Sequence, residues 1–175
     1  NKEIEDVRSN SKIYLRLDEN AVIAAKSQLR TKLLAELKPD SSKSRSLKQF
    51  DKSLFTAQGI LNGIYEKGIL RSSEQLESAN ENRLIYLLAG NIANQVRVDQ
   101  FYSIQSAYEK INSELKPSLG IDEKKVMKAL SESLIQNVTF DEETTERVLQ
   151  EDLNSISATR GMIPQGLLVL GRGDM

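Results

Sequence analysis

The chain has 175 residues, of which 39% are apolar and 28% are charged, so it is long enough to form a domain with a buried core. Its 24 basic and 25 acidic residues nearly balance, which argues against nucleic acid as a main partner, because phosphate binding needs a basic excess. Cysteine and histidine are absent, which excludes disulfides, thiolate chemistry and every catalytic triad that uses histidine. We therefore expect a fragment that is not an enzyme and has no metal or cofactor of its own.

Hydropathy and the first residue bear on where the chain belongs. No apolar run approaches the roughly 18 to 20 residues needed to cross a bilayer. The chain starts on Asn1 rather than on a methionine. We interpret it as a piece of a longer protein, from which any targeting segment has been removed.

The first part of the chain predicts a strand followed by two helices. In residues 12–17 apolar and polar side chains alternate with the period of two that is typical of a half-buried strand. Asp18 is suited to cap a helix that continues to Pro39, and a polar loop at 39–46 follows. Gly68 is placed to end the second helix as a left-handed C-cap. The apolar stripe of that second helix consists of Leu47, Phe50, Leu54, Leu61 and Ile64.

The middle of the chain predicts a hairpin and two more helices. A dense apolar run at 83–91 closes on Gly90 and Asn91, and alternation resumes as far as Val98. Ser103 is suited to cap the next helix, and Asp122 the one after it. Apolar residues recur at helical spacing in both: Ile104, Tyr108, Ile111 and Leu115 in the first, and Val126, Leu130 and Leu134 in the second. Tyr108 is expected at the rim of the core, with its hydroxyl in water.

Two residues compete to cap the last helix. Thr139 with Glu142 has the spacing of a capping box, and Asp141 is the rival cap. The helix that follows is expected to face inward with Val148, Leu149, Leu153 and Ile156. With a closing pair of strands behind it, the order of elements predicts an α+β fold, a mainly helical single domain over residues 1–175 with a small sheet of scattered short strands.

Glycines punctuate the end of the chain. We predict that the backbone turns at Gly161, Gly166 and Gly171, with a short buried strand at 167–170 between the last two. Period two allows either Leu168 and Leu170 or Leu167 and Val169 on the buried face, but not both pairs. Arg160 comes where the last helix ends, and two roles stay open for it. It either caps the last carbonyls of the helix, which we favour, or contacts a ligand.

The tripeptide Arg172-Gly173-Asp174 matches a cell-adhesion signal. Three fixed residues recur by chance too often to carry that assignment. We interpret Gly171 and Gly173 as turn residues and Asp174 as a turn acceptor. An adhesive function is the weakest of the hypotheses considered.

Several stretches together resemble the extracellular domain of the seven-transmembrane HD-domain proteins. They are "IYEKGIL" (64–70), "VRVDQFYSIQSAYEKI" (96–111), "NVTFDEETTERV" (137–148) and "ISATRGMIPQGLLVLGRGD" (156–174). The likeness covers most of the chain in the right order, and the last stretch is its most specific part. Members commonly have a charged residue where this chain has Leu167, so the strand here is expected to be more buried.

The resemblance implies a place in a larger protein. In that family a membrane helix precedes this domain, and seven transmembrane helices and a cytoplasmic HD phosphohydrolase that hydrolyses cyclic di-AMP follow it. The chain would then be a non-catalytic sensory or regulatory domain on the extracytoplasmic face of the bacterial membrane. Its partners would be an unidentified extracytoplasmic ligand or protein and the parent's transmembrane and HD domains.

The alternative is a stand-alone extracytoplasmic interaction or assembly domain with no enzyme attached. The gene separates the two hypotheses. Apolar segments and an H…HD pattern downstream of Met175 support the first, and an early stop codon supports the second.

Overall fold

The structure, a computed structural model, describes residues 2–77, 83–115 and 122–161. Its helices are α1 (Lys2–Asn10), α2 (Glu19–Leu37), α3 (Ser44–Lys67), α4 (Glu74–Glu77), α5 (Ile104–Glu114), α6 (Glu123–Ser131) and α7 (Glu142–Gly161), with a short 3-10 helix, η1 (Val98–Gln100). Its strands are β1 (Ile13–Leu17), β2 (Ile85–Ala89), β3 (Ile92–Val96) and β4 (Val138–Phe140). The mainly helical α+β fold with a small sheet is confirmed.

The strands form one mixed sheet in the order β3-β2-β1-β4. β1 pairs in parallel with β2 and antiparallel with β4, so that Leu15 lies between Leu87 and Phe140. Because parallel strands need a long crossover, the chain between β1 and β2 is free to build α2, α3 and α4 outside the sheet. β2 and β3 form the predicted hairpin, which turns at Gly90 with a φ of 57°.

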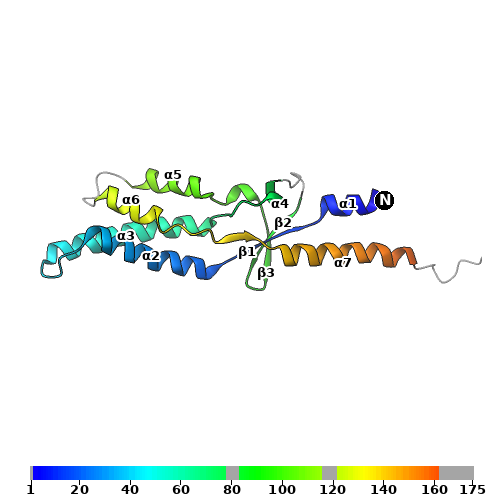
Figure 1. Cartoon of the computed structure of the whole chain (residues 1–175), viewed down its shortest axis with the longest axis horizontal. Coiled ribbons are helices and arrows are strands. Elements are labelled where there is room, and N and C mark those ends of the chain that lie inside the picture. Colours follow the sequence, from blue (N-terminus) through cyan, green and yellow to red (C-terminus); the bar gives the residue numbers. More distant parts are fainter. Residues whose placement is uncertain (1, 78–82, 116–121, 162–175) are drawn as a thin grey trace, which may run out of the picture.

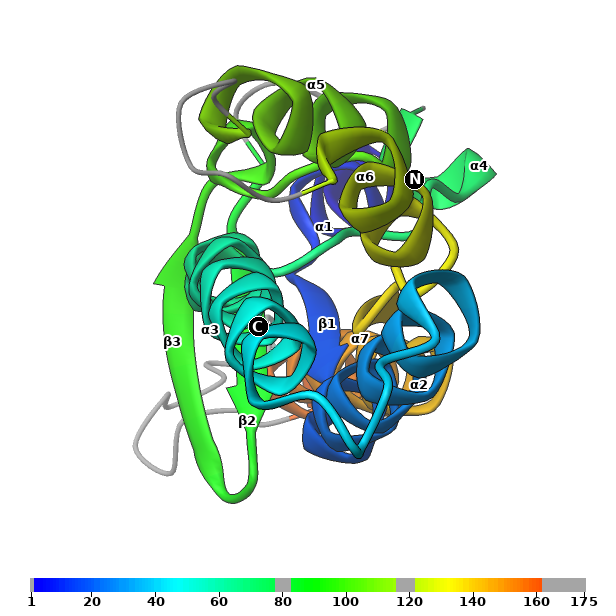
Figure 2. The same cartoon turned by 90° about the vertical axis from the view of Figure 1, so that its left-hand side faces the viewer.

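The molecule is elongated, with the sheet in its middle (Figure 1). Helices α2, α3, α5 and α6 pack into a bundle on one side of the sheet, and α1 and α7 extend from the other side, in contact with each other. Viewed along the long axis of the molecule, the helices of the bundle lie around a common centre (Figure 2). The β2–β3 hairpin projects beyond them. The two ends of the molecule are therefore built from different helices.

Two apolar cores correspond to these parts. The larger core fills the bundle and includes the fully buried Leu29, Leu33, Leu61, Ile64, Ile111 and Leu130. The smaller core belongs to the sheet and consists of Ile13, Leu15, Ile85, Phe101 and Val138. Burial of apolar area stabilises each core at about 25 cal/mol per Å². The hydrophobic effect has no direction. The orientation of the bundle relative to the sheet therefore depends on the contacts that connect the two cores.

Caps were the most predictable feature of the helices. The Asp18 side chain accepts hydrogen bonds from the N–H groups of Asn20 and Ala21 at the start of α2. Ser103 forms a capping box with Ser106 at the start of α5, and Asp122 accepts from the Lys125 N–H at the start of α6. These caps form within four residues of sequence, so their partners are always near.

Several helix details differ from the predictions. Residues 44–46 belong to α3 rather than to the loop, and Leu47 is 39% exposed. Ile104 is also exposed, because Ala107 and Ile111, with Leu115 just after the helix, form the inward side of α5. Tyr108 is 42% exposed, as expected for a residue at the rim of the core. Leu134 lies beyond the end of α6, where it packs against the bundle core. The sequence pattern also missed α1, α4, η1 and β4.

The end of α3 is the most informative correction. Gly68 occupies the C-cap position with a positive φ of 88°, but its ψ of 159° is extended rather than left-handed helical. This backbone region is open essentially to glycine alone. At Gly68 the chain therefore leaves the helix without a further helical turn and runs on between β4 and η1.

The last helix also differs from its prediction. Val148, Leu149, Leu153 and Ile156 are half-buried rather than facing a core. The reason is that α7 runs beyond the sheet, where α1 is the helix that contacts it. The predicted closing strand at 167–170 lies outside the described residues.

We expect Gly68→Ala to lower the free energy of unfolding by about 2 to 4 kcal/mol, from a disfavoured backbone and an overpacked contact. A Cβ there would lie 2.8 Å from Cγ2 of Val138. Urea denaturation measures the change. The matched control is Gly59→Ala, which meets no atom within 4 Å in the middle of α3 and should stabilise by about 0.5 to 1 kcal/mol. Equal effects of the two changes would contradict the assigned backbone conformation.

Candidate functional site at the joint of helices and sheet

Polar groups converge where the bundle meets the sheet, and this convergence is the candidate site. No cluster of three or more acidic side chains with metal-binding geometry occurs in the described ranges. We call residues Tyr65, Gly68, Ile69, Asn137 and Val138 the joint. They come from the end of α3, the segment after it, and the start of β4.

Asn137 is the centre of the joint and is fully buried. Its side-chain Oδ1 accepts a hydrogen bond from the Ile69 N–H at 2.8 Å. The Ile69 carbonyl in turn accepts from the N–H groups of Asn137 and Val138. Because the Ile69 N–H needs an acceptor, the orientation of the Asn137 amide is fixed, and its Nδ2 has no hydrogen-bond partner among the described residues.

Backbone hydrogen bonds extend the joint in two directions. The Asn137 carbonyl accepts from the Asp18 N–H at 2.7 Å, which ties it to the start of α2. The Tyr102 N–H donates to the Gly68 carbonyl at 2.9 Å, which ties it to the start of α5. Three bundle helices, α2, α3 and α5, therefore start or end at the joint.

Tyr65 adds a side-chain link between α3 and the segment before β4. Its hydroxyl donates to the Ile135 carbonyl and accepts from the Ile135 N–H, at 3.0 and 2.9 Å. Burial raises the pKa of the Tyr65 hydroxyl, while the Ile135 hydrogen bond acts in the opposite direction. The group stays protonated and keeps both bonds at neutral pH.

On the other side of the sheet, Asp141 attaches α7. Its carboxylate caps the helix through the N–H and hydroxyl of Thr144, and both Nε and Nη2 of Arg16 donate to its Oδ2, at 3.0 and 2.6 Å. Burial raises the pKa of Asp141, but the Thr144 and Arg16 bonds outweigh it and hold the pKa below its ordinary value. Asp141 is therefore the cap, and the alternative is wrong, because Thr139 lies inside β4.

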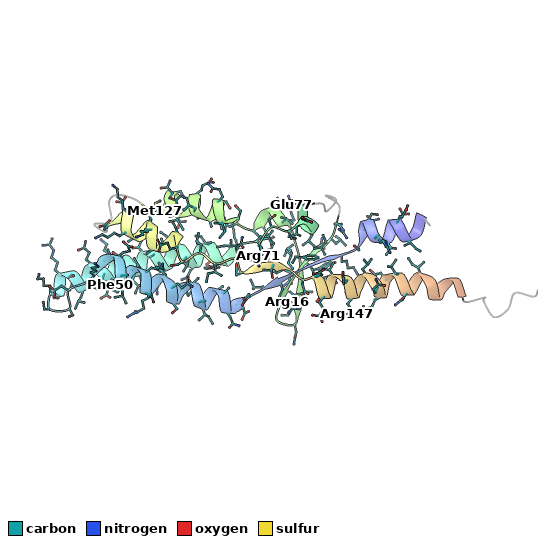
Figure 3. The ribbon with its side chains drawn as sticks, viewed as in Figure 1. Arg16, Phe50, Arg71, Glu77, Met127 and Arg147 are labelled. Carbon is teal, nitrogen blue, oxygen red and sulfur yellow. The ribbon has the colours of Figure 1, made fainter. Side chains whose placement is uncertain are left out.

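Further hydrogen bonds join α7 to the same strand. The Tyr14 N–H donates to the Thr145 hydroxyl at 3.0 Å, and the Asp141 N–H donates to the Tyr14 carbonyl at 2.9 Å. Figure 3 shows Arg16 near the middle of the molecule, where α7 leaves the sheet, with Phe50 and Met127 out in the bundle. A continuous chain of contacts thus runs from α3 through the joint, β4 and β1 to α7.

The predicted site residues are distributed unevenly. Gly68 and Asp141 lie on this chain of contacts. Arg160 is in the last turn of α7, where its side chain is not described, and Gly161 is the last helical residue rather than a turn. Gly166 and Gly171 lie outside the described residues, as does the tripeptide at 172–174.

Sequence reasoning missed Asn137, Arg16, Tyr65 and Thr145. Arg16 and Asp141 are 125 residues apart, and the partners Asn137 and Ile69 are 68 apart. Spacing rules reach only a few residues along the chain. A polar Asn137 directly before Val138, Thr139 and Phe140, which have high strand propensity, was the one available signal.

We expect Asn137→Ala to lower the free energy of unfolding by about 2 kcal/mol, because the buried Ile69 N–H loses its acceptor. Asn62→Ala, at an exposed position of α3, is the control and should stay within about 0.5 kcal/mol of the wild type. Urea midpoints for the two variants test the assignment. If Asn137→Ala lowers the free energy of unfolding no more than Asn62→Ala does, the Asn137 hydrogen bond does not stabilise the fold.

We expect Asp141→Asn to cost about 1 to 2 kcal/mol at pH 7. Since the folded pKa is lowered, the carboxylate contributes stability above about pH 4, the unfolded value, and loses it as pH falls through the folded pKa. The difference from the wild type should therefore shrink below about pH 4 in urea titrations. Asp18→Asn keeps a good cap and should change little. A difference at Asp141 that is independent of pH would contradict the ion pair.

Comparison with known proteins adds one finding. The family model described as 7TM-HD extracellular matches residues 1–175. No curated protein and no solved structure is similar enough to add a second comparison. In the described ranges, no helix combines the length and apolar character that crossing a membrane requires. The chain therefore belongs to the family of 7TM-HD extracellular domains, the non-catalytic sensory domains of membrane proteins.

Proposed function

We propose that this domain regulates a membrane-bound HD phosphohydrolase that hydrolyses cyclic di-AMP on the cytoplasmic side. Family membership supports the sensory role, and the resemblance supplies the enzyme and its substrate. The supporting observation from the structure is the path of contacts that links the bundle to α7. A sensory domain needs such a path, because a change at one place has to move another.

The arrangement of the helices gives this path a direction. Helices α1 and α7 contact each other at one end of the molecule, opposite the bundle (Figure 1). In the proposed parent both ends of the domain lead to the membrane, so α1 and α7 face it and the bundle lies farther out. Events at the bundle and the joint then act on the membrane through α7.

The attachment of α7 to β1 is the step that carries this action. Asp141 is buried and Arg16 is half-exposed, with 5% and 58% of their side chains accessible. A partly buried ion pair that also caps a helix holds α7 at a defined angle to β1. Weakening this ion pair should change how α7 moves with the sheet, while both apolar cores stay intact.

In the full-length protein in lipid vesicles, we expect Arg16→Ala to change the rate of cyclic di-AMP hydrolysis by about threefold or more, a barrier change of about 0.6 kcal/mol or more. The control is Arg97→Ala, which breaks an exposed ion pair with Asp99 away from α7. Its rate should match the wild type.

Two outcomes would count against the proposal. If the full-length protein does not hydrolyse cyclic di-AMP, the enzyme assignment is wrong and the stand-alone interaction domain replaces it. If hydrolysis is present but Arg16→Ala and Arg97→Ala behave alike, signals do not pass through the attachment of α7.

A further inference from the structure

A hollow beside the joint has the features of a small-molecule site. It measures about 320 Å³, against about 160 and 190 Å³ for two other hollows in the described part of the chain. Its apolar lining is Leu70, Leu76, Val98 and Phe101. Ligand pockets are commonly apolar concavities of about 300 to 1,000 Å³ with a few placed polar groups.

The polar groups at this hollow are Ser72, Glu77 and Ser103. The Ser72 hydroxyl donates to Oε1 of Glu77 at 2.5 Å, which holds the carboxylate in place. Ser103 accepts the Ser106 N–H as the cap of α5, so its hydroxyl is already committed. A carboxylate has about four acceptor positions, so Glu77 retains capacity for a donor from a ligand.

Charge selects the kind of ligand. Of the described residues that line the hollow, Glu77 alone is charged. An anionic ligand would meet this carboxylate with no cation among those described lining residues to offset it, whereas an ammonium group would pair with it. We propose that the hollow binds a small organic cation with an apolar body, its ammonium group on Glu77 and its body against Val98 and Phe101.

The residues that line the hollow lie next to the joint. The Leu70 N–H donates to the Tyr102 carbonyl and the Arg71 N–H to the Val138 carbonyl, each at 2.8 Å. Leu70 therefore lies between the two residues that bond to β4. A ligand here touches the segment after α3, the short helix α4 and the start of α5 at once. Its role as a signal rests on the proposed sensory function, which this class of ligand makes more specific.

The test uses three probes with one apolar body: 4-phenylbutylamine, 4-phenylbutanol and 4-phenylbutanoate. Calorimetric titration of the 175-residue chain should show the amine binding about fivefold more tightly than the alcohol, the scale of a solvent-accessible ion pair, and the carboxylate binding most weakly. Glu77→Gln should remove the preference for the amine and leave the affinity for the alcohol unchanged. Glu66→Gln, at an exposed position on α3, is the matched control and should change neither.

A second variant tests the apolar part of the site. Val98 is 38% exposed, so Val98→Trp should fold, which circular dichroism checks, and its ring should fill the hollow. The affinity for both the amine and the alcohol should fall about tenfold. Equal binding of the three probes, no binding by any of them, or an amine preference that survives Glu77→Gln would overturn the proposal.

This experiment is independent of the hydrolysis assay. Binding that follows the pattern above, together with a full-length protein whose turnover ignores both the probe and Arg16→Ala, would leave the site standing and refute the sensory function. Absent binding with Arg16-dependent turnover would do the reverse.

Discussion

The hydrogen bond from the Ile69 N–H to Oδ1 of Asn137 holds the two halves of this molecule in one arrangement. α3 ends at Lys67, and after the C-cap Gly68 the chain passes directly beside β4, where the backbone N–H of Ile69 has no regular strand partner. A buried N–H without an acceptor costs about 1 to 3 kcal/mol, so the crossing needs the Asn137 amide. Glycine at 68 lets Val138 approach closely enough for that amide to reach.

This polar joint matters because the apolar cores on its two sides are separate clusters. Apolar packing sets the stability of each cluster but fixes little of the angle between them. Hydrogen bonds at the joint are directional, and they continue through β4 and β1 to the Asp141 cap of α7. Two compact bodies connected by directional contacts are the kind of arrangement in which a small local change becomes a change of orientation.

Local features could be predicted from the sequence, and long-range ones could not. The caps Asp18, Ser103 and Asp122 and the β2–β3 hairpin depend on neighbours a few residues away. The Arg16–Asp141 pair joins residues 125 apart, and three-residue β4 is too short for a period to appear. Helical spacing in α7 identified an apolar stripe, but periodicity does not say whether a second layer covers it. The structure shows that the apolar side chains of α7 are half-buried, which the sequence pattern alone does not reveal.

Native-state hydrogen exchange tests the central claim, that Asn137 makes the bundle and the sheet one cooperative unit. The amides of Leu61 in α3 and Leu15 in β1 report on the two cores, since both residues are fully buried. We predict one shared opening free energy for these amides in the wild type, and in Asn137→Ala a value for Leu15 that is lower than that for Leu61 by about 1 kcal/mol or more. A shared opening free energy that persists in the variant, or separate values already in the wild type, would contradict the account.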